Sequence, residues 1–369
     1  MSTGYLPAAP PAPGGDTLTG WLRSLDVLLR IPAELRNEQV GRAVALEMLR
    51  CGEPILDELI ASGLLHGGER GAELFDRFDL VNLSLYSGSG TSVPEETMKF
   101  ALRWMHEHPS SLFRPRAWDY HVELSCDRPG GCPTGERDWL IARPQPEVYA
   151  GWTESLTVEP VCGDGIDLRS DGDPLLAKGV LVTNGEHREI RSARIREIVS
   201  EYPSADYRWA RMPEQLQWQP EAVLSQGYAP CIAVTLDLAA KCRAAGFPAR
   251  TRRGWIMGML DLAHSWLEVV DEDGIVKAVD PAFAILADHH SERPHPEFTA
   301  ACYGSPLNRL MPTGHEANNP IMGHTCGGAA STPKHRTMIT SQDRQPTRPA
   351  SDTSTRSDLS THDDGGVTP

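Results

Sequence analysis

The first hundred residues carry a helical pattern of apolar positions. Apolar side chains in 21–29 follow the i, i+4, i+7, i+8 spacing of an amphipathic helix, and 37–50 and 54–64 also favour helices. The segment SVPE at 92–95 has a serine and a glutamate at capping-box spacing, with a proline in the first turn. We therefore expect residues 16–117 to form a mainly helical N-terminal region.

The pattern changes after residue 117. In WDYHVELSC, residues 118–126, apolar and polar positions alternate with the period of two that is typical of a half-buried strand. SLTVEP at 155–160 is a second candidate strand, whereas 173–185 and 189–202 return to helical periodicity. The mixture predicts an α+β domain over 118–310.

The two ends of the chain differ in composition from its middle. Residues 1–15 are rich in Pro, Ala and Gly, so we expect a flexible N-terminus. Residues 312–369 are dominated by Thr, Ser, Pro, Asp, Arg and Gly and have few bulky apolar side chains. Because such a segment buries too little apolar surface to offset the entropy of ordering, the composition predicts a disordered tail.

Charge and hydropathy narrow the classes of partner. The formal net charge of −15 disfavours nucleic acid, because binding it requires a basic face. No apolar run approaches the roughly 20 residues that span a bilayer, so we expect no membrane partner. The N-terminal segment lacks the basic and apolar parts of a signal peptide. We therefore expect a cytoplasmic protein whose cysteines are mostly reduced thiols.

Two cysteines, Cys126 and Cys132, lie close together in the segment SCDRPGGCPTG. A zinc site with four protein ligands would need a second close pair of ligands, and no such pair is evident in the sequence. We therefore expect an ordinary loop with two thiols there, and no metal or other cofactor.

The segment SQGYAPCIAVTLDLAAKCRAAGFPAR, residues 225–250, predicts a helix that begins beside a cysteine. Pro230 has the fixed φ that suits a helix start, which places Cys231 in the first turn, and Gly246 and Pro248 end the helix. The positive end of the helix dipole and the unpaired N–H groups favour a thiolate and an oxyanion beside it. A free cysteine also often packs as a small apolar residue, so this position alone leaves both interpretations open.

The next forty residues supply a base and a carboxylate. HSWLEVV reads as a strand with His264, Trp266 and Glu268 on one face. If 272–274 form a hairpin loop, Asp280 lies opposite Trp266 and diagonal to His264, on the same face. A carboxylate can then hold the imidazole in one tautomer while its other nitrogen faces a thiol, as in catalytic triads.

These motifs together resemble the transglutaminase-like superfamily. Its members carry, in order, a Cys at a helix N-terminus, a G-[IF]-P-A-R segment, an H-[AS]-W-x-E strand and a D-P motif. This sequence has GFPAR at 246–250, HSWLEV at 264–269 and VDP at 279–281. The resemblance covers 170–290 and implies a papain-like α+β core, in which the cysteine helix packs on an antiparallel β-sheet.

The resemblance implies a role for each of three residues: Cys231 as the nucleophile, His264 as the general base and acid, and Asp280 as the group that orients the imidazole. The members usually have a glycine one or two residues before the cysteine, whereas here the pair 229–230 is Ala-Pro. The donors of the oxyanion hole are therefore left open.

An upstream aromatic donor assists the reaction in the transglutaminases proper. The candidates for this or a supporting role here are Tyr207, Trp209, Gln226 and Trp266. Ordinary packing or surface roles are the alternative for each of them.

Three arginines, Arg250, Arg252 and Arg253, lie between the candidate nucleophile and base in an otherwise acidic protein. They have two interpretations. One is a solvated strand with charged side chains; the other is a cationic rim that binds an acidic group of the substrate or its carrier, such as a phosphate.

The implied chemistry is thiolate attack on an amide or thioester carbonyl, which gives an S-acyl enzyme. We expect an acyltransferase, whose acyl donor is a protein glutamine, a peptide or a carrier-bound thioester and whose acceptor is an amine. The alternatives are a cysteine peptidase or amidase, and a binding module without catalysis. The fold does not choose among these.

Overall fold

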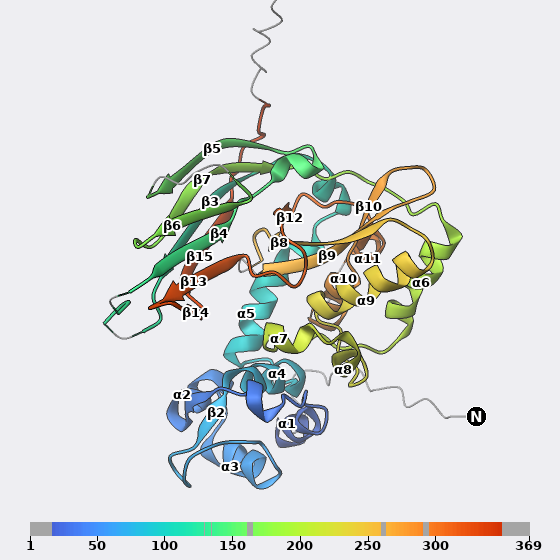
Figure 1. Cartoon of the computed structure of the whole chain (residues 1–369). Helices are drawn as coiled ribbons and strands as arrows, with labels where there is room; N and C mark the ends of the chain where they lie inside the picture. Colours follow the sequence, from blue (N-terminus) through green and yellow to red (C-terminus); the bar gives the residue numbers. More distant parts are fainter. Residues whose placement is uncertain are drawn as a thin grey trace, which may run out of the picture.

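The computed structural model describes residues 17–128, 130–133, 135–160, 165–259, 263–290 and 295–348 (Figure 1). These residues form a helical N-terminal region, a β-sandwich and an α+β core. The flexible N-terminus expected at 1–15, and the last part of the expected tail, 349–369, lie outside the described residues.

The N-terminal region is mainly helical, as its apolar pattern predicts. Its α-helices are α1 (Thr17–Asp26), α2 (Arg42–Leu49), α3 (Glu53–Ala61), α4 (Arg77–Ser87) and α5 (Val93–Leu102). Its short elements are η1 (Ala33–Leu35), η2 (Arg103–His106), η3 (Pro109–Phe113) and the antiparallel strands β1 (Glu38–Gly41) and β2 (Leu74–Asp76). The predicted capping box begins α5, since Ser92 Oγ accepts from the Glu95 N–H at 3.3 Å and the Glu95 carboxylate accepts from the Ser92 N–H.

Two four-stranded antiparallel sheets form the β-sandwich. One has the order β15 (Lys334–Ser341), β3 (Arg116–Ser125), β7 (Leu176–Thr183), β5 (Trp152–Glu159). The other has the order β14 (Ala329–Ser331), β13 (Met322–Cys326), β4 (Arg137–Ala142), β6 (Asp167–Asp171). Alternate residues of both sheets, including Tyr120, Trp139 and Leu168, are buried in one common cluster, so the sheets pack face to face.

Two expectations from the sequence are wrong in the region of the sandwich. The helix expected at 173–185 is replaced by β7, which lies between β3 and β5; a Cβ on Gly179 would collide with the backbone of β5. The disorder expected from residue 312 is wrong as far as residue 348, because β13, β14 and β15 form there. Each sheet of the sandwich buries one face only, so a few apolar side chains such as Ile321 and Ile339 are enough when the backbone pairs with β3 and β4.

The core is built on a five-stranded antiparallel sheet. Its order is β11 (Tyr303–Gly304), β10 (Val276–Val279), β9 (Ala263–Val270), β8 (Ala249–Ile256), β12 (Leu310–Pro312). The helices around it are α6 (Ala193–Ser204), α7 (Glu214–Gln217), α8 (Pro220–Leu224), α9 (Cys231–Ala244), α10 (Pro281–His290) and α11 (Pro296–Cys302), and η4 (Pro146–Tyr149) also packs there. This arrangement confirms the predicted α+β core with the cysteine helix on an antiparallel sheet.

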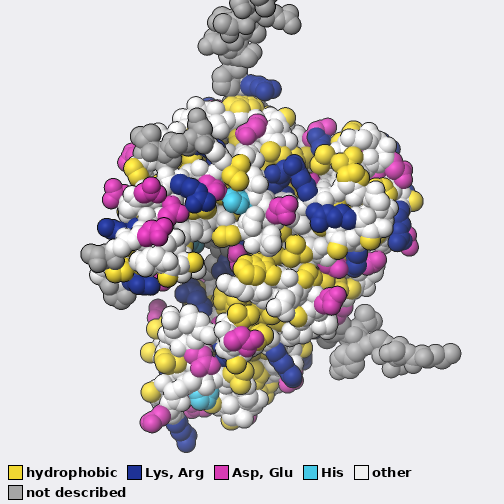
Figure 2. Space-filling view, viewed as in Figure 1, with side chains coloured by type: hydrophobic (Ala, Val, Ile, Leu, Met, Phe, Trp, Pro, Cys, Tyr) yellow, Lys and Arg dark blue, Asp and Glu magenta, His cyan; other side chains and the backbone are white. Residues whose placement is uncertain are grey.

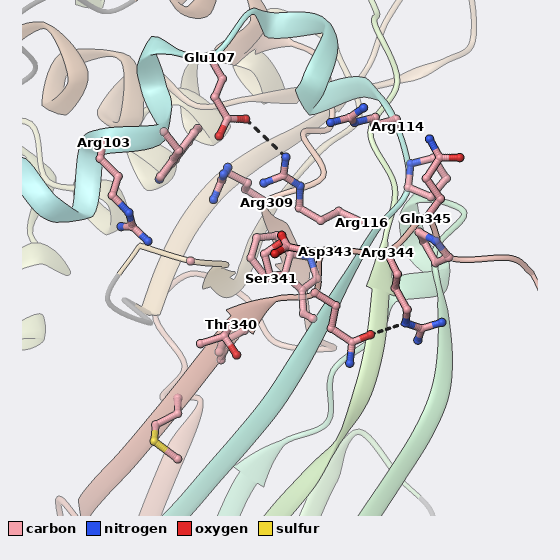
Figure 3. A pocket seen from close by; sticks show the side chains of 18 of the residues that line it. Arg103, Glu107, Arg114, Arg116, Arg309, Thr340, Ser341, Asp343, Arg344 and Gln345 are labelled. Atoms are coloured by element: carbon pink, nitrogen blue, oxygen red, sulfur yellow. Dashed lines mark hydrogen bonds and ion pairs between the residues drawn. The ribbon is translucent and has the colours of Figure 1, made fainter.

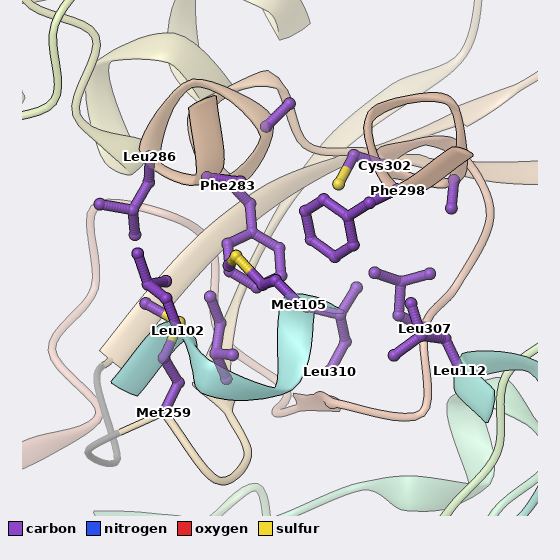
Figure 4. Close-up of a cluster of buried hydrophobic side chains, with 14 of the residues drawn as sticks. Leu102, Met105, Leu112, Met259, Phe283, Leu286, Phe298, Cys302, Leu307 and Leu310 are labelled. Carbon is purple, nitrogen blue, oxygen red and sulfur yellow. The ribbon is translucent and has the colours of Figure 1, made fainter. Parts of the chain in front are cut away.

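Two apolar clusters hold the sheet between helices. One cluster joins α9 and α6 to sheet residues such as Leu267 and Val269. The other, shown in Figure 4, joins α5 and η2 of the N-terminal region to α10, α11 and Trp266 of the sheet. The N-terminal region is therefore anchored to the core through Leu102 and Met105 rather than connected by a loose linker.

Within the described residues, none of the helices is long and apolar enough to cross a membrane. Figure 2 shows acidic and basic side chains interspersed over one face, with a hollow between the N-terminal helices and the sandwich.

Candidate active site

Cys231 is the first residue of α9. Pro230 precedes it in an extended conformation, with φ −72° and ψ 156°. The loop before it is pinned by two backbone hydrogen bonds, from the Arg208 N–H to the Gly227 carbonyl and from the Ala229 N–H to the Arg208 carbonyl, both 2.8 Å. Gly227 takes a φ of +80°, which favours glycine. The Ala-Pro pair therefore leaves the thiol at the helix N-terminus, in the position that the sequence predicts.

The structure brings Cys231, His264 and Asp280 together. The His264 side chain is 8% exposed, and its Nε2 lies 2.5 Å from Asp280 Oδ2. The Cys231 thiol and the imidazole each shift the pKa of the other, and Nδ1 is the ring nitrogen that Asp280 leaves available to the thiol. One imidazole therefore links the thiol to the carboxylate.

Asp280 reaches His264 because of the hairpin between β9 and β10. The loop consists of 272–274, with Gly274 at φ +73°, and Val279 pairs with Leu267, so the next residue comes opposite Trp266. This is the predicted register. Asp280 also accepts a hydrogen bond from the Phe283 N–H at 3.0 Å, so the first turn of α10 fixes its carboxylate.

Cys231 and His264 shift each other's pKa in directions that favour the charged form of both. Burial alone raises the pKa of the Cys231 thiol, but the hydrogen bond and charge of His264, the charge of Arg253 and the Ser265 backbone hold that pKa below its ordinary value. Burial lowers the pKa of His264, yet Asp280 and Cys231 raise it well above its ordinary value. Both shifts favour a thiolate–imidazolium pair.

Trp266 supports the imidazole rather than offering a donor at the thiol. It is fully buried, and its ring lies nearly parallel to that of His264, with centroids 6.0 Å apart. Its Nε1–H donates to the Tyr149 hydroxyl at 2.7 Å, which donates to the Glu268 carboxylate at 2.5 Å. Tyr149 comes from η4, and no motif in the sequence distinguished it.

Arg252 and Arg253 of β8 are buried and do not form the cationic rim that the sequence left open. Arg252 is 5% exposed and donates to both oxygens of Glu268, and Arg250 pairs with the same carboxylate from the protein surface. Arg253 is 1% exposed and donates to Ser265 Oγ and to Glu214. Arg252 and Arg253 therefore serve as internal ion pairs, whereas the Arg250 side chain remains exposed.

The residues proposed near the oxyanion lie in different environments. Gln226 is exposed, and its amide donates to the Ala222 carbonyl and accepts from the Arg30 N–H. Tyr207 and Trp209 are partly buried and pack in the cluster that contains Cys231. Of these, Trp209 also contacts the cluster around Trp266.

Gln217, which the sequence analysis missed, lies at the N-terminus of α9. Its side chain is largely buried, and its Oε1 accepts from the Ile232 N–H at 3.2 Å. This bond occupies the amide oxygen, so the amide nitrogen is the remaining donor of this side chain. Gln217 lies 14 positions before Cys231, on a separate short helix, so only the fold brings the two together.

The described part of the chain also contains a cavity of about 1170 Å³ lined by arginines from separate elements (Figure 3). Arg309 lies at its centre, with its guanidinium carbon 3.7 Å from the centroid of the Trp104 ring. The lining also includes Arg103, Arg116 and Arg344, but none of Cys231, His264 and Asp280. This cavity is therefore separate from the thiol site.

The expectation of a plain two-thiol loop at Cys126 and Cys132 is incomplete. His324 and Cys326 of β13 lie beside these two thiols and complete a group with the donor atoms of a metal site. The second pair was overlooked because it lies in the segment that we expected to be disordered.

Comparison with known proteins agrees with the resemblance seen in the motifs. Residues 180–281 match the family model of the transglutaminase-like superfamily. A crystal structure described as a "putative cysteine protease" from Cytophaga hutchinsonii superposes with a TM-score of 0.41 and 13% identity, over 63% of this chain and 93% of that chain. No curated protein matches the chain significantly. Over residues 180–281 the chain is therefore similar to the transglutaminase-like superfamily.

Proposed function

We propose that this protein is an acyltransferase that forms or exchanges amide bonds through a thioester on Cys231. The observation that carries the proposal is the grouping of Cys231, His264 and Asp280, in which His264 is bonded to Asp280 and lowers the pKa of the Cys231 thiol. A thiolate at a helix N-terminus, an imidazole beside it and a carboxylate behind the imidazole are the three parts that acyl transfer by cysteine requires.

In the first half-reaction, the Cys231 sulfur attacks the carbonyl carbon of the donor. The carbonyl oxygen becomes an oxyanion, and the free N–H of Cys231 and the Gln217 amide are the proposed donors to it. Collapse of the tetrahedral intermediate breaks the bond to the leaving amine or thiol, which takes its proton from the His264 imidazolium. The acyl group remains on sulfur as a thioester.

In the second half-reaction, an acceptor amine attacks the thioester carbonyl. His264, now neutral, takes the proton that the amine loses, and Asp280 stabilises the imidazolium that forms. Collapse expels the Cys231 thiolate and releases the amide. No step requires a metal or an organic cofactor.

A peptidase or amidase with the same residues is the alternative, with water in place of the amine. The two differ only in the acceptor, which the geometry of Cys231, His264 and Asp280 does not select. A glutamine side chain, a peptide and a carrier-bound thioester are the proposed donors, and we propose that the reaction takes place in the cytoplasm, where Cys231 stays reduced.

Intact-mass analysis of the full chain with acyl thioesters tests the proposal. Wild type should gain one acyl group, and Cys231→Ala should gain none. Cys242→Ala is the matched control, because this buried thiol belongs to the same helix but not to the site. Discharge of the adduct by amines rather than by water supports transfer. Cleavage of peptides with no adduct from thioesters would assign the protein to the peptidases instead.

A module without catalysis would behave differently from either enzyme. Its Cys231 should react with iodoacetamide at neutral pH no faster than free cysteine does. Faster alkylation of Cys231, with the adduct located by peptide mapping, excludes that alternative.

A further inference from the structure

A second group of thiols lies in the β-sandwich, away from Cys231. Cys126 follows the end of β3, Cys132 lies in the loop between β3 and β4, and His324 and Cys326 lie on β13. Their ligand atoms all lie within 4.8 Å of one another. His324 and Cys326 are 4% and 1% exposed, so the group is held in the protein interior on one side.

We propose that Cys126, Cys132, His324 and Cys326 bind a structural zinc ion. Three thiols and one imidazole are a donor set that structural zinc sites use, and soft sulfur donors in a tetrahedral arrangement select zinc over calcium or magnesium. Four protein ligands fill the coordination shell, so the ion would have no open position for a substrate.

The ligand atoms of this group lie near the spacing that a zinc ion requires, and one pair matches it. Zinc bonds of about 2.3 Å to sulfur and about 2.0–2.1 Å to nitrogen place tetrahedral ligand atoms about 3.5–3.8 Å apart. The Cys126 and Cys326 sulfurs are 3.6 Å apart, and the Cys132 sulfur is 3.2 Å from His324 Nε2. A Cys126–Cys326 disulfide would need its sulfurs at about 2.05 Å, and it would not involve Cys132 or His324.

The surroundings of His324 prepare it as a ligand. Its Nδ1 lies 3.1 Å from the Asp138 carbonyl oxygen, to which it can only donate, so the proton sits on Nδ1 and the Nε2 lone pair faces Cys132. The ring stacks on Trp139, with centroids 3.6 Å apart and an interplanar angle of 14°. A hydrogen bond on the far nitrogen of this kind is typical of metal-binding histidines.

Glycines let the two ligand loops approach one another. Gly130 and Gly131 have φ of +84° and +83° between the first two cysteines, and Gly327 and Gly328 have φ of +63° and +81° directly after Cys326. Such tight, glycine-rich turns bring sulfur atoms from two loops to one point, where an ion would join β3 of one sheet to β13 of the other.

Metal analysis of the full chain tests this site. The protein is purified without chelators from medium that contains zinc and iron, and both metals are measured by mass spectrometry. We expect one zinc per chain in wild type and in the control Cys51→Ser, a part-exposed thiol of the N-terminal region. Cys326→Ser and His324→Ala should reduce the zinc content by at least about tenfold.

A measurement on wild type keeps the test valid if these variants fail to fold. X-ray absorption at the zinc edge should give sulfur neighbours at about 2.3 Å and a nitrogen neighbour at about 2.0–2.1 Å. Wild type without zinc, iron in place of zinc, or a Cys126–Cys326 disulfide found by peptide mapping would each overturn the assignment. The site does not depend on the reaction at Cys231, so its failure leaves the proposed function intact.

Discussion

In two places of the described chain a thiol lies beside an imidazole. The two places differ in the hydrogen-bond partner of the other ring nitrogen. His264 is bonded to the Asp280 carboxylate and has one thiol beside it. His324 is bonded to a neutral backbone carbonyl and lies among three thiols. A carboxylate stabilises an imidazolium, which can exchange a proton with a substrate, whereas a carbonyl fixes a neutral ring as a ligand. The partner of the far nitrogen therefore separates a candidate acid–base residue from a candidate metal ligand.

Removal of the nucleophile should have the largest effect and should affect one site only. Cys231→Ala is expected to lower kcat/KM for acyl transfer by about 10⁴-fold or more, because it removes the sulfur that attacks the donor. Its zinc content should equal that of wild type. Steady-state kinetics and metal analysis on one preparation check both outcomes. Loss of zinc in Cys231→Ala would mean that the two sites are not independent.

Replacing the Asp280 carboxylate by a neutral amide tests whether the charge beside His264 is what makes it an acid–base residue. Asp280→Asn should lower kcat by about 10²–10⁴-fold, because the imidazolium loses its counter-charge. The change should hardly affect Tm, since asparagine can still accept from the Phe283 N–H and cap α10. Kinetics and thermal unfolding measure the two effects. A large fall in Tm with little change in kcat would make Asp280 a structural residue.

The two glutamines near the cysteine helix form a matched pair. Gln217→Ala should lower kcat by about 10²–10³-fold, the usual cost of one oxyanion donor. Gln226→Ala should leave kcat near its wild-type value, because this exposed amide is bonded away from the thiol. Single-turnover acylation distinguishes them. Equal effects of both variants would refute the oxyanion role of Gln217.

The pH dependence of alkylation compares Cys231 with Cys242 of the same helix. A lowered pKa means that Cys231 remains a thiolate below the ordinary thiol range and loses reactivity only as the pH falls through that lowered pKa. Burial raises the pKa of Cys242 to about 11, so it should gain reactivity only in strongly alkaline solution. Peptide mapping after timed iodoacetamide treatment follows both thiols. Parallel profiles would contradict the thiolate–imidazolium pair.

Loss of one buried hydroxyl should have the smallest effect. Tyr149→Phe leaves the Trp266 Nε1–H without its acceptor and Glu268 without one donor, which should lower the free energy of unfolding by about 1–3 kcal/mol. Denaturant unfolding measures this change. A kcat that falls further than the population of folded protein would show that the network also positions His264.

The sequence by itself was enough for the elements around Cys231. A helix that begins after Pro230, a strand that carries His264 and Trp266 on one face, and a hairpin loop ending at Gly274 all follow from local patterns. Turn length then sets strand register, so the meeting of Asp280 with His264 was also predictable. Local chemistry and short-range geometry carry that part of the site.

Only the tertiary structure decided the remaining features. β7 has a periodicity that suits a helix, and neighbouring strands on both sides determine its conformation. Gln217 and Tyr149 reach the site from other elements, and the buried pairing of Arg252 with Glu268 depends on which strands are interior. His324 and Cys326 join Cys126 across about 200 positions because β13 and β3 belong to two packed sheets. Contacts between residues so far apart depend on how sheets pack, and no short-range pattern in the chain records that.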